Sequence, residues 1–258
     1  MGIIPVGSCN GLARHVDIPV NVKGSLHILN QACIHKLDYG IINDMPFFCT
    51  CGMGFDAFIS MKFAEAGKRG VITYVQKVLE EGLKCEPETY DIEDNEGTHH
   101  YKAFLVSVAN ASQYGNNAYI APQASMSDGM LEIILMAPFD LLDAPQVAIE
   151  MFNKTLNKSS KIKTFKAKHI HIHRKKEGVI HFDGDPIMAG NDVDIRIVPR
   201  GIKVVVNPKE HKDKRKPNMI QTSFSQLFSN IDLIRSNLNK QGRKFQALNK
   251  TILRKLNI

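Results

Sequence analysis

Residues 101–117, YKAFLVSVANASQYGNN, decide the fold because they join a buried strand to an unusually polar loop. The run Ala103–Val108 has the length and the apolar content of a strand that packs in a core. Eight small or polar residues follow it, which is more hydrogen-bonding capacity than a simple turn requires. We therefore expect Asn110, Ser112 and Tyr114 either to line a functional site or to form a structural turn.

Short strands separated by turns continue on both sides of this stretch. The other strand candidates are Ile41–Asn43, Pro46–Cys51, Thr89–Ile92, Leu131–Met136, Lys168–His173, Gly178–Phe182, Val193–Ile197 and Ile202–Val206. Segments with helical spacing interrupt them at residues 55–68, 71–83 and 144–153. This pattern predicts a β-sandwich with helical insertions.

The first 36 residues have a different pattern. Gly2–Val6 is apolar and is expected to form a short buried strand, and a small polar loop at Gly7–Gly11 follows it. A helix is expected to start at Leu12, and residues 24–36 have the spacing of a second helix. A strand, a polar loop and a helix start can present free backbone N–H groups to an anion. A structural turn explains the same loop.

Residues 208–258 form a third segment. It opens with the charged run KEHKDKRKP, which has the composition of a linker. Apolar residues from Ile220 to Leu256 then recur at helical spacing and predict two basic amphipathic helices. These helices would either pack on the body of the protein or lie on an anionic membrane surface.

The positive charge is concentrated in two blocks. The chain has 33 basic and 26 acidic residues, a formal net charge of +7. Residues 151–176 contain nine basic and no acidic residues, and residues 208–258 contain twelve basic and three acidic residues. Because the remainder is acidic and aromatic residues are sparse in the basic blocks, we do not expect nucleic acid as a partner. An anionic surface or ligand at defined places fits the two blocks better.

Five cysteines, an odd number, and the lack of a visible secretion signal predict a reducing cytoplasmic environment. Cys49 and Cys51 form a C-x-C pair among apolar residues, which favours two buried strand residues over a metal pair. The sequence contains no stretch of about 18 apolar residues, so we predict no membrane-spanning helix.

Three histidines alternate with isoleucine at His169, His171 and His173. On a strand they would lie on one face, about 7 Å apart between neighbours. That spacing permits a metal site, but the surrounding lysine and arginine residues favour a solvated basic face.

Two Asp-Gly turns are candidates for chemistry. Asp128 precedes the strand candidate at 131–136, where its carboxylate could cap its own turn or bind a hard cation. Asp183 and Asp185 flank a glycine directly after the strand candidate at 178–182. Two carboxylates at a strand end suit a general base beside a metal-bound phosphate. A plain type I turn is the alternative.

Five segments occur in order along the chain: GIIPVGSCNGLAR, CGMGFDA, NASQYGNNAYIAP, SDGML and FDGD. Together they resemble the soluble diacylglycerol kinase family, which includes the YegS-like lipid kinases and the sphingosine and ceramide kinases. The resemblance covers residues 2–207. It implies ATP-dependent transfer of a phosphoryl group to a lipid hydroxyl, diacylglycerol-like or sphingoid.

The resemblance also implies an NAD kinase/diacylglycerol kinase-like two-domain fold, an α/β remnant plus a mainly-β part. Residues 1–36 would be the remnant of the α/β nucleotide-binding catalytic domain. Residues 37–207 would be the C-terminal β-sandwich domain, and residues 208–258 a basic amphipathic helical tail. The active site is expected in the cleft between the two domains.

Functional residues of the family carry over to this sequence, with ATP and Mg²⁺ as the implied cofactors. The glycine loop that contacts the nucleotide maps to Gly7, Ser8, Asn10 and Gly11. The magnesium site maps to the Asp128 carboxylate with the main-chain carbonyls of Ser125 and Met130. The general base maps to Asp185, preceded by Asp183 and Gly184.

Three departures from the family pattern affect the expected activity. The Gly-Gly-Asp-Gly-Thr phosphate motif, which belongs upstream of Ile3-Ile4-Pro5, is absent. Cys9 stands where the family usually has glycine, and a side chain there adds bulk beside the phosphates. Asp185 replaces the usual glutamate, so the base is one methylene shorter. We therefore expect either a truncated lipid kinase of lowered activity or a non-catalytic remnant that binds lipid or a membrane surface.

The expected partners are a lipid substrate and an anionic membrane surface, with a cytoplasmic location that is peripheral at the inner face of the membrane. Apolar surface left by the shortened nucleotide domain is expected to cause self-association, for example as a homodimer. An NAD kinase, a distant relative with a similar plan, is disfavoured because its own nucleotide motifs are not evident.

Overall fold

The computed structural model describes residues 1–7, 9–58, 86–139 and 143–208. The chain divides into two compact units, Met1–Lys214 and Arg215–Ile258. The predicted amphipathic tail, most of the predicted helical region at 55–83 and Ser8 lie outside the described residues. None of the described helices is long and apolar enough to cross a membrane.

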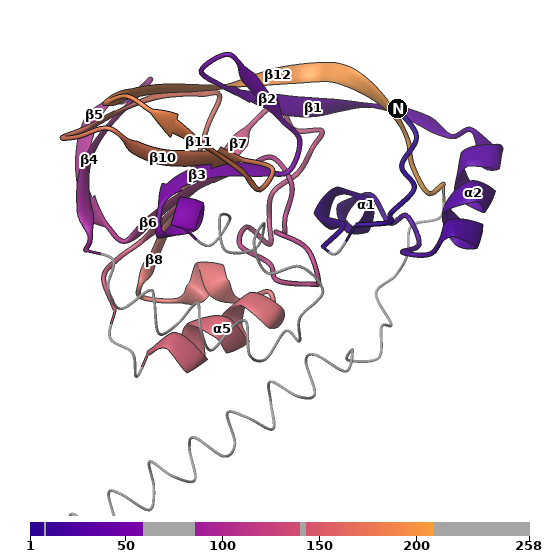
Figure 1. Cartoon of the computed structure of the whole chain (residues 1–258), viewed down its shortest axis with the longest axis horizontal. Coiled ribbons are helices and arrows are strands. Elements are labelled where there is room, and N and C mark those ends of the chain that lie inside the picture. Colours follow the sequence, from indigo (N-terminus) through magenta and orange to yellow (C-terminus); the bar gives the residue numbers. More distant parts are fainter. Residues whose placement is uncertain (8, 59–85, 140–142, 209–258) are drawn as a thin grey trace, which may run out of the picture. The chain divides into compact units, whose positions relative to one another are not determined.

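Two six-stranded sheets form the body of the first unit (Figure 1). The first sheet has the spatial order β2 (Met45–Phe47), β1 (Ile34–Ile42), β12 (Asp192–Val205), β9 (His169–Arg174), β4 (Glu88–Asp94) and β5 (Gly97–Ala103). The second has the order β11 (Asp185–Ala189), β10 (Gly178–Phe182), β3 (Thr50–Gly54), β6 (Leu105–Ala109), β7 (Leu131–Met136) and β8 (Ile162–Ala167). All neighbouring strands are antiparallel, which confirms the predicted sandwich.

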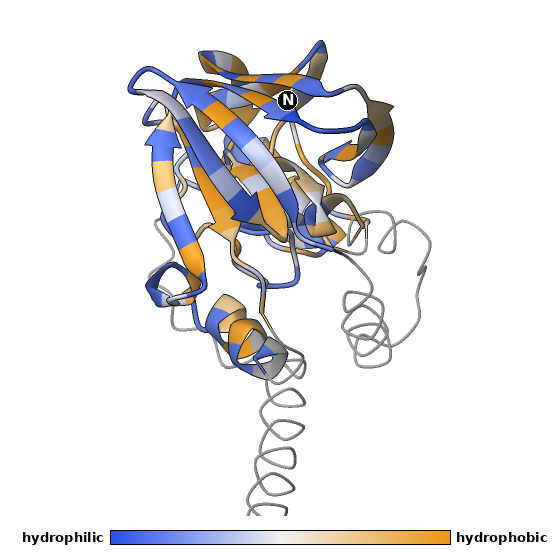
Figure 2. Cartoon of the chain, turned by 90° about the vertical axis from the view of Figure 1, so that its left-hand side faces the viewer, coloured by the Kyte–Doolittle hydropathy of each residue, from blue (hydrophilic) through white to orange (hydrophobic). Residues whose placement is uncertain are grey.

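The main core lies between the two sheets. Strand β9 shows how the sequence builds it: Ile170 and Ile172 are buried, whereas His169 and His173 are exposed, because successive side chains of a strand point to opposite faces. Figure 2 shows this alternation as orange and blue bands along the strands. Burial of each isoleucine contributes roughly 1.5–3 kcal/mol. A slip of one residue would turn these side chains to solvent, so the core also fixes the strand register.

The second sheet is buried on both faces at its centre. Every residue of β6 and β7 is buried, including the polar Ser107 and Glu132. A second core covers the outer face and includes Phe55, Val147 of α5 (Ala144–Phe152) and Leu156, which begins the short helix η1 (Leu156–Lys158). The covered centre of this sheet is therefore a rigid support for the loops at its ends.

Strands β7 and β10 have the predicted bounds, but other predictions fail for identifiable reasons. The sequence pattern does not predict β8, because lysines interrupt its apolar residues, nor β11, most of which is exposed. The two strands predicted at residues 193–197 and 202–206 form the single strand β12, which runs through Pro199. Its pairing with β1 along most of its length holds the strand together.

The predicted strand at Gly2–Val6 is wrong. These residues form no strand, and Ile4 and Val6 are 44% and 79% exposed. A strand requires a neighbour that satisfies its backbone N–H and C=O groups. The contact to β12 is made before this segment, at the Met1 carbonyl, which accepts a hydrogen bond from Val205 N (2.9 Å).

Two short helices follow, α1 (Gly11–His15) and α2 (Val22–Gln31). They lie beside the end of the sandwich formed by β1 and β12 (Figure 1). Helix α2 ends before residue 36, where the prediction placed its end, because Ala32 adopts a left-handed conformation with φ of 50°. Strand β1 therefore crosses the predicted domain boundary between residues 36 and 37.

The outer face of the first sheet is mixed in charge, which corrects the predicted basic face. Asp192 of β12 lies opposite His173 of β9, His173 opposite Asp91 of β4, and Asp91 opposite His100 of β5. His173 Nδ1 is 2.8 Å from Asp192 Oδ1, and His100 Nδ1 is 2.6 Å from Asp91 Oδ1. The acids come from strands distant in sequence, so the basic run alone does not reveal them. Within the described ranges, no group of three or more potential ligands is arranged for a metal ion.

Candidate active site

The turn of the β10–β11 hairpin carries Asp183, whose carboxylate has a structural use. Asp183 and Gly184 have φ of 51° and 99°, so the turn is of type I′ rather than the predicted type I. The carboxylate accepts hydrogen bonds from the backbone N–H groups of Phe48 (2.7 Å), Cys49 (2.6 Å) and Thr50 (3.2 Å). Asp183 thereby ties the hairpin to the segment that leads into β3.

Asp185, at the start of β11, differs from Asp183 in its partners, although both residues are exposed. Asp185 is exposed, and within the described part of the chain its carboxylate makes no hydrogen bond or ion pair. Burial of the Asp183 carboxyl raises its pKa, and the three backbone N–H donors oppose that shift. The hairpin therefore holds one engaged carboxylate and one available carboxylate two residues apart.

A buried cluster of Asp56, His181 and Tyr114 joins three of the sequence motifs. Asp56 follows β3, and its Oδ2 is 2.7 Å from His181 Nε2 of β10; both side chains are buried. The Tyr114 hydroxyl donates to Asp56 Oδ1. Burial, and then the Asp56 carboxylate, raise the pKa of Tyr114, so this phenol keeps its proton and remains a donor.

Close packing at Gly52 permits this cluster. A Cβ atom on Gly52 would lie 2.0 Å from Asp56 Oδ2 and 2.6 Å from the Val106 carbonyl oxygen. Only glycine leaves room for the Asp56 carboxylate to fold back over β3 at this position. His181 Nδ1 is buried without a hydrogen-bond partner among the described residues. Each carboxylate oxygen of Asp56 therefore has a partner, whereas Nδ1 of His181 has none among the described residues.

The loop after β6 connects the hairpin to the first sheet through Asn110. Its side-chain Nδ2 donates to the carbonyls of Asp38 (3.0 Å) and Phe48 (2.8 Å), and its backbone N donates to the carbonyl of Cys49 (2.9 Å). The carbonyl of Cys49 thus accepts a hydrogen bond from Asn110 N, and its N–H group donates one to Asp183. The predicted loop residue Asn110 is buried and holds main-chain segments together.

Ser112 of the same loop holds helix α1. His15 Nδ1 accepts a hydrogen bond from Ser112 N (3.1 Å) and lies 2.9 Å from Ser112 Oγ. An acceptor nitrogen cannot carry a proton, so this contact requires the neutral imidazole. Burial lowers the pKa of His15 to about 4, which keeps the ring neutral near pH 7.

The polar loop before α1 packs against the same loop rather than standing free. A Cβ atom on Gly11 would lie 2.9 Å from the Tyr114 carbonyl oxygen, so this glycine is required for packing. The Cys9 carbonyl accepts a hydrogen bond from Asn116 N (3.2 Å). The left-handed residue of the loop is Asn10, with φ of 54°, and Cys9 has no positive φ. A cysteine in place of glycine therefore causes no left-handed backbone strain at position 9.

Not all predicted nucleotide-binding residues are accessible in this loop. Gly7 is exposed and Asn10 is partly exposed, while Gly11 is buried. The Asn10 side chain donates to the Gly7 carbonyl (2.7 Å). A phosphate group could thus approach Gly7 and Asn10, but not Gly11.

The predicted magnesium ligand Asp128 is engaged locally. Its Oδ1 accepts a hydrogen bond from Met130 N (3.1 Å), and its Oδ2 pairs with Lys166 Nζ (2.7 Å). The Ser125 hydroxyl lies 3.2 Å from that of Ser127. A main-chain N–H donor and an ammonium group thus face the two carboxylate oxygens of Asp128, as in an Asp-Gly turn with a counter-ion.

Asp38 is a buried residue that the sequence pattern does not reveal. It lies at an irregularity in the β1–β12 pairing, between Leu37 and Tyr39. Its Oδ2 accepts from Gly129 N (2.8 Å) and its Oδ1 from Arg200 N (2.7 Å). Asp38 thereby connects Gly129 of the SDGML motif to Asn110, whose side chain donates to the Asp38 carbonyl.

The structure therefore brings the five motifs into one hydrogen-bonded network through contacts between distant positions. Sequence reasoning locates Asp183, Asp185 and the polar loop, but it misses His15, Asp38, Asp56 and His181. Asp56 and His181 lie inside or next to quoted motifs, and an ionisable residue beside an apolar strand is a weak signal that could have found them. The buried thiol of Cys51 is inert, because burial and then the nearby Asp56 raise its pKa.

Comparisons with known protein families identify the class of protein. Residues 50–206, more than half of the chain, match the YegS C-terminal NAD kinase beta sandwich-like domain. Residues 1–42 match the diacylglycerol kinase catalytic domain. The fold is thus that of an NAD kinase-like β-sandwich protein. The chain belongs to the YegS-like diacylglycerol kinase family.

Individual relatives are similar at low sequence identity. An uncharacterized protein of Synechocystis sp. is 26% identical over 82% of this chain, and the match covers 47% of the relative. A probable lipid kinase YegS-like of Serratia proteamaculans is 24% identical over 81% of this chain and 68% of the relative. A putative diacylglycerol kinase from Bacillus anthracis shares the fold, with a TM-score of 0.61 and 21% identity over 80% of this chain and 68% of that chain. The chain thus spans about half to two thirds of the length of these proteins.

Proposed function

We propose that the protein is a lipid kinase that transfers the γ-phosphoryl group of ATP to the hydroxyl group of a lipid, diacylglycerol-like or sphingoid. The observation that carries the proposal is the Asp183–Asp185 pair. The Asp183 carboxylate accepts three backbone hydrogen bonds, whereas the exposed Asp185 carboxylate accepts none from the described residues. Membership of the YegS-like diacylglycerol kinase family supports this class of reaction.

In this proposal Asp185 is the general base. Its carboxylate takes the proton of the lipid hydroxyl as that oxygen attacks the γ-phosphorus, and the bond from the γ-phosphorus to ADP breaks. A positioned base of this kind contributes roughly 10²–10⁴-fold to the rate. Asp183 contributes by holding the turn, because small displacements of a reacting group are costly. The exposed part of the loop before α1, Gly7 and Asn10 with Ser8, would contact the nucleotide.

A divalent cation accompanies ATP in this proposal, but no described residue is assigned to it. Phosphoryl transfer needs charge neutralisation on the phosphates, which a divalent cation supplies. Asp128 is already paired with Lys166, so we assign that turn a structural role.

The proposal is tested by measuring phosphate transfer from radiolabelled ATP to diacylglycerol and to sphingosine in mixed micelles. We expect Asp185→Asn to lower kcat by two or more orders of magnitude while the melting temperature stays unchanged. Asp192→Asn, an exposed aspartate on the outer face of the first sheet, is the matched control and should retain full activity. A near-normal rate in Asp185→Asn would remove this residue as the base. No transfer to either lipid by the parent chain would reject the kinase function for this polypeptide.

A non-catalytic role in binding a lipid or membrane surface is the second candidate function. It rests on the predicted basic amphipathic helices of residues 208–258, which would serve as the anchor on an anionic membrane surface. In the first basic block, Lys161 and Lys166 are already paired with Asp143 and Asp128. The protein would then be cytoplasmic and peripheral at the inner face of the membrane.

Sedimentation with liposomes of anionic or neutral lipid tests this second function. Binding to anionic liposomes that disappears when residues 209–258 are deleted would support it. An absence of binding in the full chain would reject it, whatever the result of the kinase assay.

A further inference from the structure

A pocket of about 660 Å³ opens between the two sheets, away from the Asp183–Asp185 turn. Its strand residues are Gly54 at the end of β3, Glu88 and Thr89 at the start of β4, Arg174 at the end of β9, and Gly178 and Val179 at the start of β10. Asp185 pairs with Phe182 at the other end of the hairpin. Four residue steps along β10 separate the two ends, roughly 13 Å. The pocket is therefore a separate site from the candidate base.

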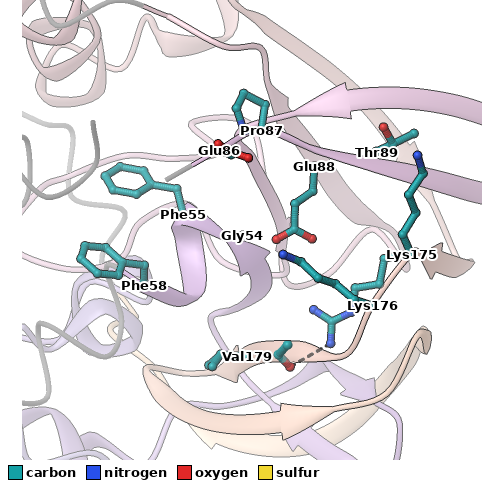
Figure 3. A pocket seen from close by; sticks show the side chains of 12 residues that line it. Gly54, Phe55, Phe58, Glu86, Pro87, Glu88, Thr89, Lys175, Lys176 and Val179 are labelled. Carbon is teal, nitrogen blue, oxygen red and sulfur yellow. Dashed lines mark hydrogen bonds between the residues drawn. The ribbon is translucent and has the colours of Figure 1, made fainter. Parts of the chain in front are cut away.

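One end of the pocket is aromatic. Figure 3 shows the rings of Phe55 and Phe58 on the same side of the opening. Their centroids are 5.9 Å apart with an angle of 16° between the planes, and Phe55 is also 4.4 Å from the ring of Phe104 in the core. Such a wall accepts an aliphatic chain without loss of hydrogen bonds, and the volume lies within the usual range for small-molecule sites.

The other end of the pocket is charged. Figure 3 places Lys175 and Lys176 there, with Glu88 between them and the rings. The lining contains three cations, Arg174, Lys175 and Lys176, and two carboxylates, Glu86 and Glu88. The difference is one surplus positive charge, so a singly charged anion would neutralise the lining.

The buried guanidinium of Arg174 gives this end its preference. Arg174 is 3% exposed. Its Nη2 donates to the carbonyls of Gly178 (2.8 Å), Ala189 (2.8 Å) and Gly190 (3.0 Å), and its Nε also donates to Gly190 (3.1 Å). Its Nη1 makes no hydrogen bond, and the guanidinium makes no ion pair, within the described ranges. Burial lowers the pKa of Arg174, and Tyr90 and Glu88 beside it oppose that shift. An anionic group at Nη1 would add a charge-assisted hydrogen bond to this guanidinium.

We propose that this pocket binds a single-chain amphiphile with an anionic headgroup, a carboxylate or a phosphate monoester. The headgroup lies at Arg174, Lys175 and Lys176, and the hydrocarbon chain lies against Phe55 and Phe58. The same lining disfavours a cationic headgroup, which would add to the surplus positive charge. This binding does not depend on kinase activity, because the pocket does not contain Asp185.

Displacement of a fluorescent fatty acid, dansylaminoundecanoate, from the full chain tests the proposal. The chain has no tryptophan, so dansyl emission is free of energy transfer from the protein's own indoles. The competitors are palmitate, 1-palmitoyl lysophosphatidate, neutral monopalmitoylglycerol and cationic hexadecylamine, each below its critical micelle concentration. We expect the two anionic competitors to displace the probe at concentrations at least tenfold below those of the neutral and cationic ones. The ratio between palmitate and lysophosphatidate then tells which anionic headgroup is preferred.

Variants locate the site. Lys175→Gln/Lys176→Gln should weaken probe binding roughly tenfold, while the control Lys203→Gln, on β12 and outside the pocket lining, should not change it. Arg174→Lys should weaken binding further, but it also removes hydrogen bonds to three carbonyls and lowers stability, so the lysine pair carries the test. Asp185→Asn should leave binding unchanged.

Equal displacement by palmitate and monopalmitoylglycerol, preference for hexadecylamine, or no probe binding by the parent chain would each overturn the proposal. Loss of binding in Asp185→Asn would also overturn it, because the lipid would then lie at the candidate base. None of these outcomes decides whether the chain is a kinase, so the two proposals fail separately.

Discussion

The two Asp-Gly turns of this protein are alike in sequence and different in use. Asp128 is held by its own turn and by Lys166 on the neighbouring strand β8. Asp183 receives N–H groups from Phe48, Cys49 and Thr50, more than 130 positions earlier in the chain. In this protein, the Asp-Gly turn that belongs to the candidate site is the one on which donors from a distant segment converge. Three measurements test this contrast.

Removal of the Asp183 carboxylate should have the largest effect. Asp183→Ala leaves three backbone N–H groups without their acceptor, and we expect the free energy of unfolding to fall by about 2–3 kcal/mol. Urea denaturation followed by circular dichroism measures this. Asp185→Ala is the matched control and should lie within about 0.5 kcal/mol of the parent. Equal effects of the two substitutions would show that the distinction between engaged and available carboxylates is wrong.

Acid should weaken the second long-range contact, between His15 and Ser112, by a smaller amount. The pKa of His15 falls from 6.5 to about 4 on folding, so between these values the unfolded state binds more protons. The stabilisation is complete above pH 6.5 and declines as the pH falls toward 4. We expect a loss of about 1–2 kcal/mol over this window, less than the full shift implies, because the ring is partly exposed.

This prediction is measured as the stability difference between the parent and His15→Gln at pH 7, 6, 5 and 4. The difference should shrink as the pH falls, because glutamine does not titrate. A difference that stays constant over the four pH values would show that His15 is not buried in its neutral form.

Removal of the Asp128 carboxylate should have the smallest effect. Its partners are one backbone N–H and a partly exposed lysine, and such surface pairs contribute less than about 1 kcal/mol. We expect Asp128→Ala to lower the melting temperature slightly and by the same amount in Mg²⁺ and in EDTA. A rise in melting temperature with Mg²⁺ that is present in the parent and absent in Asp128→Ala would instead establish a cation site at this turn.

The sandwich could be predicted from the sequence where a local pattern is strong. Strand β7 has only buried residues and β10 ends at a tight turn, so both are delimited by their own residues. The strand predicted at Gly2–Val6 fails because its apolar content says nothing about a neighbour to pair with. Strand β8 escapes prediction because lysines interrupt its apolar pattern, and its pairing with β7 is what makes it a strand.

The candidate site could be predicted only in part. The FDGD segment and the polar loop after β6 stand out by composition, so Asp183, Asp185 and Asn110 are found from the sequence. Their roles cannot be predicted, because Asp183 and Asn110 form hydrogen bonds with main-chain groups of the β2–β3 connection, which is distant in the sequence. The pair of Asp56 and His181 spans 125 positions, and no local pattern links residues at that separation.

The strand-rich fold, the order of the five motifs and the family can be read from the sequence, because these depend on local hydrophobic pattern and on residue types along the chain. The folded structure is needed to show which carboxylate is engaged, which histidine stays neutral and where the basic face is neutralised by acids. The physical reason is that hydrogen bonding, burial and charge pairing depend on neighbours in space, and folding chooses those neighbours from distant parts of the chain.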